Sequence, residues 1–324
     1  ESEPELEALS EVAAAKGVAA PVAIRVNPDV DAGTHDKIST GRKENKFGIE
    51  AEHAVELYAR AQAMKGIRTL GLAVHIGSQL TDLGPYRAAF ERVAWLVRRL
   101  RAQGLKVSHL DLGGGLGIVY HREQPPSPAD YGRLVREIIG PLGCAIAIEP
   151  GRSLVGNAGV LLTRVVYVKQ GSARRFVIVD AAMNDLARPT LYDAYHDIVT
   201  VAAPPSGAEL APVDVVGPVC ETGDTFAVGR PLPPVESGDL LALMTSGAYG
   251  AVMASTYNAR PLVPEVLVKG ARFAEVRARQ DYDTMLKMDV MPPWLTDLSG
   301  RQVDPSTSDD PTRRKPARRS RTAS

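Results

Sequence analysis

Residues 144–152 read Cys-Ala-Ile-Ala-Ile-Glu-Pro-Gly-Arg, and this stretch decides how the rest of the chain is interpreted. The apolar run at 145–148 predicts a short buried strand. The Pro150-Gly151 pair predicts a sharp exit from it, and its glycine lets a backbone N–H approach a bound anion closely. Arg152 offers a planar fork of donors for a carboxylate or phosphate, and Glu149 could pair with a cationic ring nitrogen. An ordinary strand-to-loop turn with a surface ion pair would also fit these residues.

Three similar strands precede this one, at 22–26, 69–75 and 107–112. Helical spacing of apolar residues predicts helices at 3–16, 51–64, 85–103 and 130–139. Short apolar strands that alternate with helices are typical of parallel β/α units. Chemically reactive or anion-binding residues follow each strand: Asn27, His75, Ser78, Gly113, Gly114, Gly115, Glu149 and Arg152.

Residues at strand ends are compatible with two architectures. A β/α barrel builds its active site at the carboxyl ends of its strands, and an open doubly wound sheet binds ligands at the same ends near a switch point. We favour a barrel because all four strand ends carry such residues.

The pattern changes after about residue 160. Short strands at 160–169, 175–180, 213–216, 240–244 and 265–268 are separated by Gly/Pro turns without a long helix, which predicts a mostly antiparallel β domain. We therefore expect a partial barrel over 1–158, a β domain over 159–296 and a disordered basic tail over 297–324. The polar loop at 33–49 is long enough to suggest a function.

Composition excludes several classes of protein. The 324 residues are 44% hydrophobic and 23% charged, as in soluble globular proteins. A formal net charge of zero argues against a nucleic-acid binder, and apolar runs fall short of the roughly 18 residues that a membrane-spanning helix needs. The acidic start at 1–7 does not resemble a signal peptide. Cys144 and Cys220 are the only cysteines, which favours the cytoplasm and predicts no metal site.

Ten segments, taken in order and spacing, resemble the diaminopimelate decarboxylases over about residues 1 to 295. These are fold-type III pyridoxal-phosphate enzymes, related to ornithine decarboxylases and alanine racemases. The segments are Arg25-Val-Asn-Pro-Asp29, Ser39-Thr-Gly41, Asn45-Lys-Phe-Gly-Ile49, His75-Ile-Gly-Ser-Gln-Leu80, Leu110-Asp-Leu-Gly-Gly-Gly-Leu-Gly117, Glu149-Pro-Gly-Arg152, Ala187-Arg-Pro-Thr-Leu-Tyr192, Gly217-Pro-Val-Cys-Glu-Thr-Gly-Asp224, Gly247-Ala-Tyr-Gly250 and Tyr257-Asn-Ala-Arg-Pro261. The resemblance implies an alanine-racemase-like partial (β/α)8 barrel followed by a β-sandwich or β-barrel.

The resemblance also implies the site residues. By this resemblance, Glu149 would keep the ring nitrogen of pyridoxal 5′-phosphate protonated, and His75 would stack on the ring as a catalytic residue. Cys220 matches the family's proton donor, a role that a thiol could fill because it is a neutral acid near pH 7. The other expected cofactor contacts are Ser78, Gly113, Gly114, Gly115, Gly151, Arg152 and Tyr249. The expected substrate contacts are Arg152, Arg188, Tyr192, Glu221 and Tyr249.

Each of these residues also has an ordinary structural interpretation. Three glycines can form a tight turn, and a lone histidine at a strand end is commonly structural. Arg188 and Tyr192 could lie in a surface loop, and Cys220 could be a buried core residue.

The resemblance further implies a homodimer in which the loop carrying Cys220 completes the partner's site. Lys46 and Asp224 match positions that form an ion pair between subunits in related decarboxylases.

One feature of the family is missing. Its cofactor-binding lysine lies on an early barrel strand in a Tyr-x-x-Lys-x-Asn context, and nothing here matches it. A barrel needs eight strands in about 250 residues, so we expect roughly 90 residues or more to be absent from the N-terminal side. The chain is then a portion of a longer decarboxylase or a shortened homologue, and we expect it to be inactive alone.

The expected reaction is decarboxylation of meso-2,6-diaminopimelate to L-lysine and carbon dioxide, the last step of lysine biosynthesis. Two alternatives stay open. One is a non-catalytic homologue that binds partners, which the missing lysine favours. The other is a related decarboxylase of polyamine precursors.

Overall fold

The computed structural model describes residues 1–31, 46–292 and 295. Most of the loop predicted at 33–49 and the tail predicted at 297–324 lie outside these residues. The chain divides into two compact units, Glu1–Asn258 and Ala259–Ser324. The boundary predicted near residue 158 stays a prediction.

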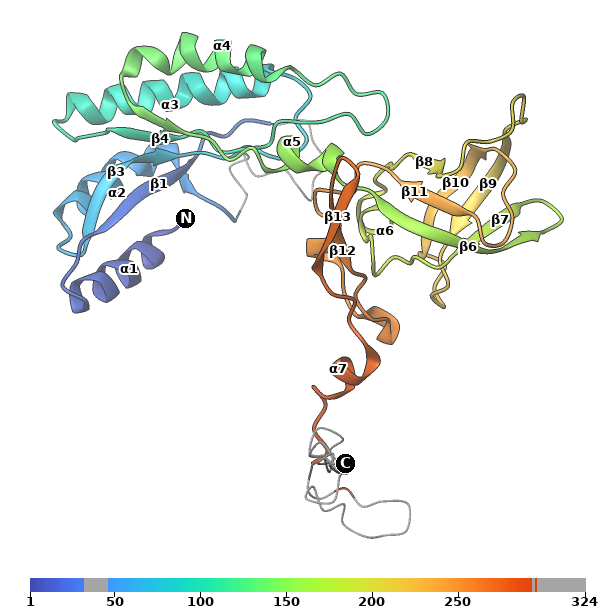
Figure 1. The fold of residues 1–324 in the computed structure, drawn as a ribbon. Coiled ribbons are helices and arrows are strands. Elements are labelled where there is room, and N and C mark those ends of the chain that lie inside the picture. Colours follow the sequence, from blue (N-terminus) through green and yellow to red (C-terminus); the bar gives the residue numbers. More distant parts are fainter. Residues whose placement is uncertain (32–45, 293–294, 296–324) are drawn as a thin grey trace, which may run out of the picture. The chain divides into compact units, whose positions relative to one another are not determined.

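A five-stranded parallel sheet forms the first part of the larger unit (Figure 1). Its strands lie in the order β2-β1-β3-β4-β5, so β1, β3, β4 and β5 follow one another across the sheet as in a barrel. The elements are α1 (Glu3–Ala15), β1 (Ala20–Asn27), β2 (Ile49–Glu50), α2 (Ala51–Ala63), β3 (Ile67–Ala73), α3 (Gly84–Ala102), β4 (His109–Asp111), α4 (Pro128–Ile138) and β5 (Ala145–Ala147). The predicted alternation of strands and helices is confirmed.

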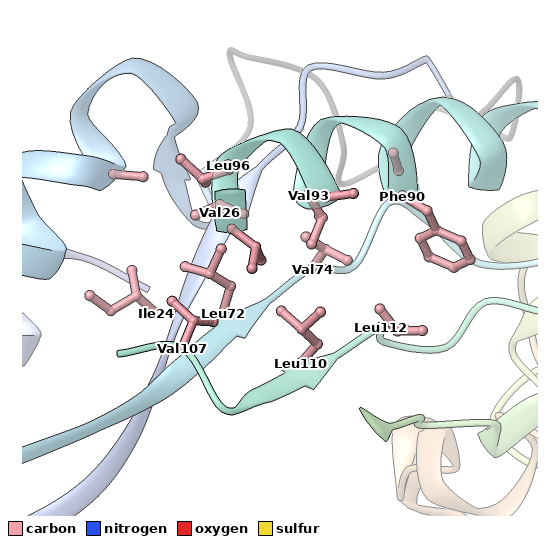
Figure 2. Close-up of a cluster of buried hydrophobic side chains, with 14 of the residues drawn as sticks. Ile24, Val26, Leu72, Val74, Phe90, Val93, Leu96, Val107, Leu110 and Leu112 are labelled. Carbon is pink, nitrogen blue, oxygen red and sulfur yellow. The ribbon is translucent and has the colours of Figure 1, made fainter. Parts of the chain in front are cut away.

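The core of this part lies between the sheet and its helices. Ile24, Leu72 and Leu110 occupy one row of the strand register and are at most 5% exposed. Phe90 and Val93 of α3 point toward these strands (Figure 2). The apolar face predicted for α3 is therefore the face that covers the sheet.

A six-stranded sheet follows in the order β10-β9-β7-β6-β11-β8. All its pairs are antiparallel except β7 with β9, so the mostly antiparallel domain is confirmed. Its strands and neighbouring helices are α5 (Gly151–Val155), β6 (Leu161–Gln170), β7 (Arg175–Val179), α6 (Arg188–Tyr192), β8 (Ile198–Thr200), β9 (Ala211–Val216), β10 (Thr225–Leu232) and β11 (Leu240–Leu243). The two edge strands, β8 and β10, were not predicted. Pro231 lowers the strand signal of β10 and is tolerated because β10 lies at an edge.

The smaller unit contains an antiparallel hairpin and a short helix. The hairpin pairs β12 (Glu265–Lys269) with β13 (Arg272–Arg277), and the Glu265 carboxylate lies 2.6 Å from Arg277. The helix α7 (Tyr282–Leu286) is capped by Asp281, which accepts a hydrogen bond from the Thr284 N–H at 2.6 Å. Of this unit only β12 was predicted.

No helix among the described residues is both long enough and apolar enough to cross a membrane.

We predict that Phe90→Ala lowers the free energy of unfolding by about 3–5 kcal/mol, because Phe90 is fully buried and its loss leaves a cavity. The matched control is Trp95→Ala on the same helix, where the side chain is 51% exposed and the cost is about 1 kcal/mol or less. Chemical denaturation measures both. Equal costs for the two variants would contradict the described core.

Candidate active site

The carboxyl ends of three neighbouring strands meet at one edge of the parallel sheet. The Val74 N–H donates to the Asp111 carbonyl at 2.9 Å, and the Glu149 N–H donates to the Gly113 carbonyl at 2.8 Å. The residues that follow β3, β4 and β5 are therefore brought together, as predicted.

Backbone packing at this edge requires the three consecutive glycines. A Cβ atom on Gly113, Gly114 or Gly115 would lie 2.1–2.2 Å from a carbonyl oxygen of an adjoining segment. Gly113 and Gly115 also have positive φ values of 67° and 94°. A side chain at any of these positions would push the strand ends apart.

Two of the three glycine N–H groups already have partners. The Gly113 N–H donates to Asp111 Oδ1 at 2.9 Å, and the Gly114 N–H donates to His75 Nδ1 at 3.2 Å. The Gly115 N–H has no partner among the described residues, so it is the one available to an anion. The segment forms the tight turn, and its role in binding an anion stays a prediction.

His75 is a neutral imidazole held by this segment. Its Nδ1 accepts the Gly114 N–H and therefore carries no proton. Burial lowers the pKa of His75, and the charge of nearby Arg25 lowers it further. Arg25 also donates to the His75 carbonyl at 3.4 Å. The ring is thus fixed in orientation and in tautomer.

All three residues of β5 are exposed, so the prediction of a buried strand is wrong. Glu149 and Gly151 follow β5 and are also exposed. No side-chain partner of Glu149 is found among the described residues, which leaves its carboxylate free to pair with a cation. The Gly151 N–H already donates to the Glu149 carbonyl at 2.9 Å and begins the short helix α5. A contact of this N–H with a phosphate would require that bond to break.

Arg152 is buried, with 7% of its surface exposed. Its guanidinium donates to the Ser78 hydroxyl at 3.1 Å and to the Tyr120 hydroxyl, and it lies 4.7 Å from the Tyr249 ring centroid. The Arg152 Nε atom is buried without a hydrogen-bond partner. A buried N–H of this kind points to an acceptor that the described residues do not supply.

Arg188, at the start of α6, is the second buried guanidinium and is also 7% exposed. It lies 4.5 Å from the Tyr120 ring centroid, and its Nη1 donates to His196 Nε2 at 2.9 Å. Burial lowers the pKa of Arg188, and the charge of Arg152 lowers it as well. Neither arginine has a carboxylate partner among the described residues.

These observations fit an anionic cofactor and substrate. Two buried like charges repel each other, and a phosphate or carboxylate bound beside them would offset both the repulsion and the cost of burial. The free Gly115 N–H and the unpartnered Arg152 Nε supply further donors. The residues present therefore fit pyridoxal phosphate and an amino acid substrate.

Two tyrosines predicted as substrate contacts lie beside the arginine pair. Tyr249 stacks on Arg152 and has a positive φ of 56°, an unusual conformation for a tyrosine. Tyr192 is half-buried at the end of α6, and its phenol influences the pKa of Arg188. The interpretation of Arg188 as a surface-loop residue is wrong, because Arg188 is buried.

The loop with Cys220 and Glu221 is a separate part of the predicted site. Both residues are exposed, and among the described residues no hydrogen bond or ion pair joins them to Arg152 or Arg188. The Glu221 carboxylate accepts a hydrogen bond from the Tyr257 hydroxyl at 2.6 Å, and this raises the pKa of Tyr257. The interpretation of Cys220 as a buried core residue is wrong.

Asp224, at the end of this loop, is buried and organises the loop. Its carboxylate accepts the N–H groups of Met183 and Val219, each at 2.7 Å. Lys46 lies 4.9 Å from the Phe47 ring centroid. The ion pair predicted between Lys46 and Asp224 of two subunits stays a prediction.

Three contributors to the site were not predicted from the sequence: Gln79, Tyr120 and His196. The Gln79 amide makes two hydrogen bonds to the backbone of Ile118, with its nitrogen 2.6 Å from the carbonyl and its oxygen 3.1 Å from the N–H. Gln79 thereby fixes the segment that carries Tyr120. The quoted motif at 75–80 contains Gln79, but no local signal marks Tyr120 or His196.

Comparison with known proteins identifies the class. Residues 1–156 match the family model described as the pyridoxal binding domain of pyridoxal-dependent decarboxylases. The fold and this match confirm a pyridoxal-phosphate cofactor and a barrel-type first domain.

More specific relatives are diaminopimelate decarboxylases. Those of Pseudomonas aeruginosa and Zymomonas mobilis are 54% and 49% identical, over 86% and 91% of this chain and 67% and 70% of their own lengths. A crystal structure of the Helicobacter pylori enzyme complexed with L-lysine is 41% identical, with a TM-score of 0.85 over 89% of this chain and 71% of that one. The chain belongs to the diaminopimelate decarboxylase family.

We predict that the protein loses stability between pH 6.5 and pH 4 because of His196. Burial lowers the pKa of this fully buried residue to about 4, so the unfolded chain takes up a proton at a higher pH than the folded chain does. Stability from His196 is complete above pH 6.5, declines as the pH falls to about 4, and changes by at most about 3 kcal/mol.

Denaturation at a series of pH values measures this effect. The His196→Gln variant, which has no imidazole there, should show a flatter profile between pH 6.5 and 4. Parallel profiles for the two proteins would contradict the assignment.

Proposed function

We propose that this chain serves the reaction of its family, the pyridoxal-phosphate-dependent decarboxylation of meso-2,6-diaminopimelate to L-lysine and carbon dioxide, and that turnover also requires the family's cofactor-binding lysine, which has no match in this sequence. The observation that carries the proposal is the pair of buried arginines, Arg152 and Arg188, without a carboxylate partner among the described residues. A substrate with two carboxylates and two ammonium groups supplies the missing anions.

When bound, pyridoxal phosphate supplies a ring that accepts the electrons left behind as the carboxyl group departs. The chain's own residues prepare the site. Glu149 holds a proton at the ring nitrogen, and neutral His75 covers the ring face. The Gly115 N–H and the Ser78 hydroxyl bind the phosphate.

The substrate residues divide into two groups. Arg152, Arg188 and Tyr249 bind and orient a carboxylate within one chain, as their mutual contacts support. Glu221 binds an ammonium group, and the Cys220 thiol returns a proton to the carbon that has lost its carboxyl group.

We also propose that the working unit is a homodimer with shared sites. Cys220 and Glu221 are exposed and make no hydrogen bond or ion pair with the arginine pair of their own chain, within the part that the structure describes. A second copy would present its own Cys220 loop to each arginine pair. A cytoplasmic location is consistent with two free thiols and no disulfide in the described chain.

We predict that activity depends on supplying the lysine that the sequence lacks. The chain alone, with pyridoxal phosphate, should release no carbon dioxide from meso-diaminopimelate. The chain joined to the part of the P. aeruginosa relative that it does not match, which should supply this lysine, should release carbon dioxide and L-lysine in equal amounts. In that fusion, Arg188→Met should lower kcat/KM at least about 30-fold, because a charge-assisted contact is lost.

A substrate panel completes this experiment. Ornithine, arginine and L-lysine should be poor substrates of the fusion. Turnover of one of these in preference to diaminopimelate would favour the alternative hypothesis of a decarboxylase of polyamine precursors. A fusion that binds the cofactor covalently but decarboxylates none of these amino acids would favour the hypothesis of a non-catalytic homologue that binds partners.

We predict that the fusion sediments as a dimer. Two inactive variants, Arg152→Met and Cys220→Ala, should regain part of the activity when mixed, because one of the mixed sites contains both native residues. A monomer at high protein concentration with full activity would contradict the shared site.

A further inference from the structure

His196 contacts Arg188, and the proposed function gives it no part in binding or catalysis. It follows α6, is fully buried, and packs its ring edge-on against Tyr120 with centroids 5.4 Å apart. Its Nε2 lies 2.9 Å from Arg188 Nη1, and its Nδ1 lies 2.8 Å from the Met244 carbonyl oxygen.

We propose that His196 is a positioning residue that fixes Arg188 for a substrate carboxylate while leaving the charge of Arg188 uncompensated. The identification of the anion as a substrate carboxylate rests on the proposed function. The positioning of Arg188 by His196 rests on the geometry alone.

The two hydrogen bonds determine the tautomer of the ring. A guanidinium can only donate, so Nε2 accepts and carries no proton. A carbonyl oxygen can only accept, so Nδ1 carries the proton and donates it to Met244. His196 is therefore neutral while both bonds are present.

The groups around His196 disfavour a positive charge on its imidazole ring. The charged groups that face His196 are the guanidinium groups of Arg188, Arg152 and Arg230, and Arg230 also donates to the His196 carbonyl at 3.0 Å. Both ring nitrogens are already engaged and the residue has no exposed surface. Acid–base exchange with a substrate is thus excluded, and a positioning role is what the geometry permits.

A neutral acceptor has a specific advantage at this position. An aspartate or glutamate would hold Arg188 equally well, but it would form an ion pair and compete with the substrate carboxylate. His196 restricts the guanidinium through one nitrogen, and the Tyr120 ring restricts it from one face. Arg188 Nε and Nη2 make no hydrogen bond with the described residues, so they remain for the ligand. Restricting a flexible side chain before binding lowers the entropy cost of binding.

The test compares two ligands that differ only in a carboxylate, L-lysine and 1,5-diaminopentane. Titration calorimetry is done on the full chain with pyridoxal phosphate present. His196→Leu should weaken L-lysine binding about tenfold or more and leave 1,5-diaminopentane unchanged. His196→Gln, whose amide oxygen can accept from Arg188, should restore most of the L-lysine affinity. His53→Leu, at an exposed histidine of α2, is the control and should change neither.

A second measurement does not depend on ligand binding. The nitrogen chemical shifts of the His196 ring should identify a neutral Nδ1–H tautomer, and Arg188→Met should move the Nε2 shift. If the wild-type chain does not bind L-lysine, the proposed function loses its support, and the shifts alone then decide the inference. An Nε2 shift that Arg188→Met leaves unchanged would overturn it, as would equal weakening of both ligands by His196→Leu.

Discussion

The repulsion between two buried guanidinium groups is the constraint on which the site depends. Arg152 and Arg188 are each 7% exposed, the charge of Arg152 lowers the pKa of Arg188, and neither has a carboxylate partner in the described chain. Removing a charge from water is expensive, and placing two like charges together adds to the cost. A bound phosphate or carboxylate would offset both costs.

Neutral groups hold the pair in place. Ser78, at the end of β3, and Tyr120 accept hydrogen bonds from Arg152, and the Tyr120 ring also faces Arg188. Gln79 fixes the segment that carries Tyr120. These contacts bring together the segments that follow the strands of the parallel sheet, α5 and α6, within one compact unit. Ser78 and Arg152 follow strands of the parallel sheet, Arg188 lies in α6, and Tyr249 lies in the segment after β11.

Much of this arrangement follows from the sequence, because strand ends of a parallel sheet must converge. The glycines at 113–115, His75 and Arg152 were predicted on that ground. The alternating pattern also predicted α1 to α4 and the strands β1, β3, β4 and β5 to within a few residues. Tyr120 and His196 were not predicted, because their partners lie far from them in the sequence and no short motif contains both members of a pair. Tyr120 and Arg152, which form a hydrogen bond, are 32 residues apart in the sequence. His196 and Met244 are 48 residues apart. The edge strand β10 was missed because Pro231 and Gly229 weaken its strand signal.

The most direct measurement is denaturation of the full chain with and without pimelate, which is the diaminopimelate skeleton without its amino groups. Pimelate should stabilise the wild-type chain by an amount that grows with its concentration, and should not stabilise Arg152→Met. Without ligand, Arg152→Met should be about as stable as the wild type, because the lost contacts are offset by the removed repulsion. Equal stabilisation of both proteins by pimelate, or a large loss of stability in ligand-free Arg152→Met, would contradict the account.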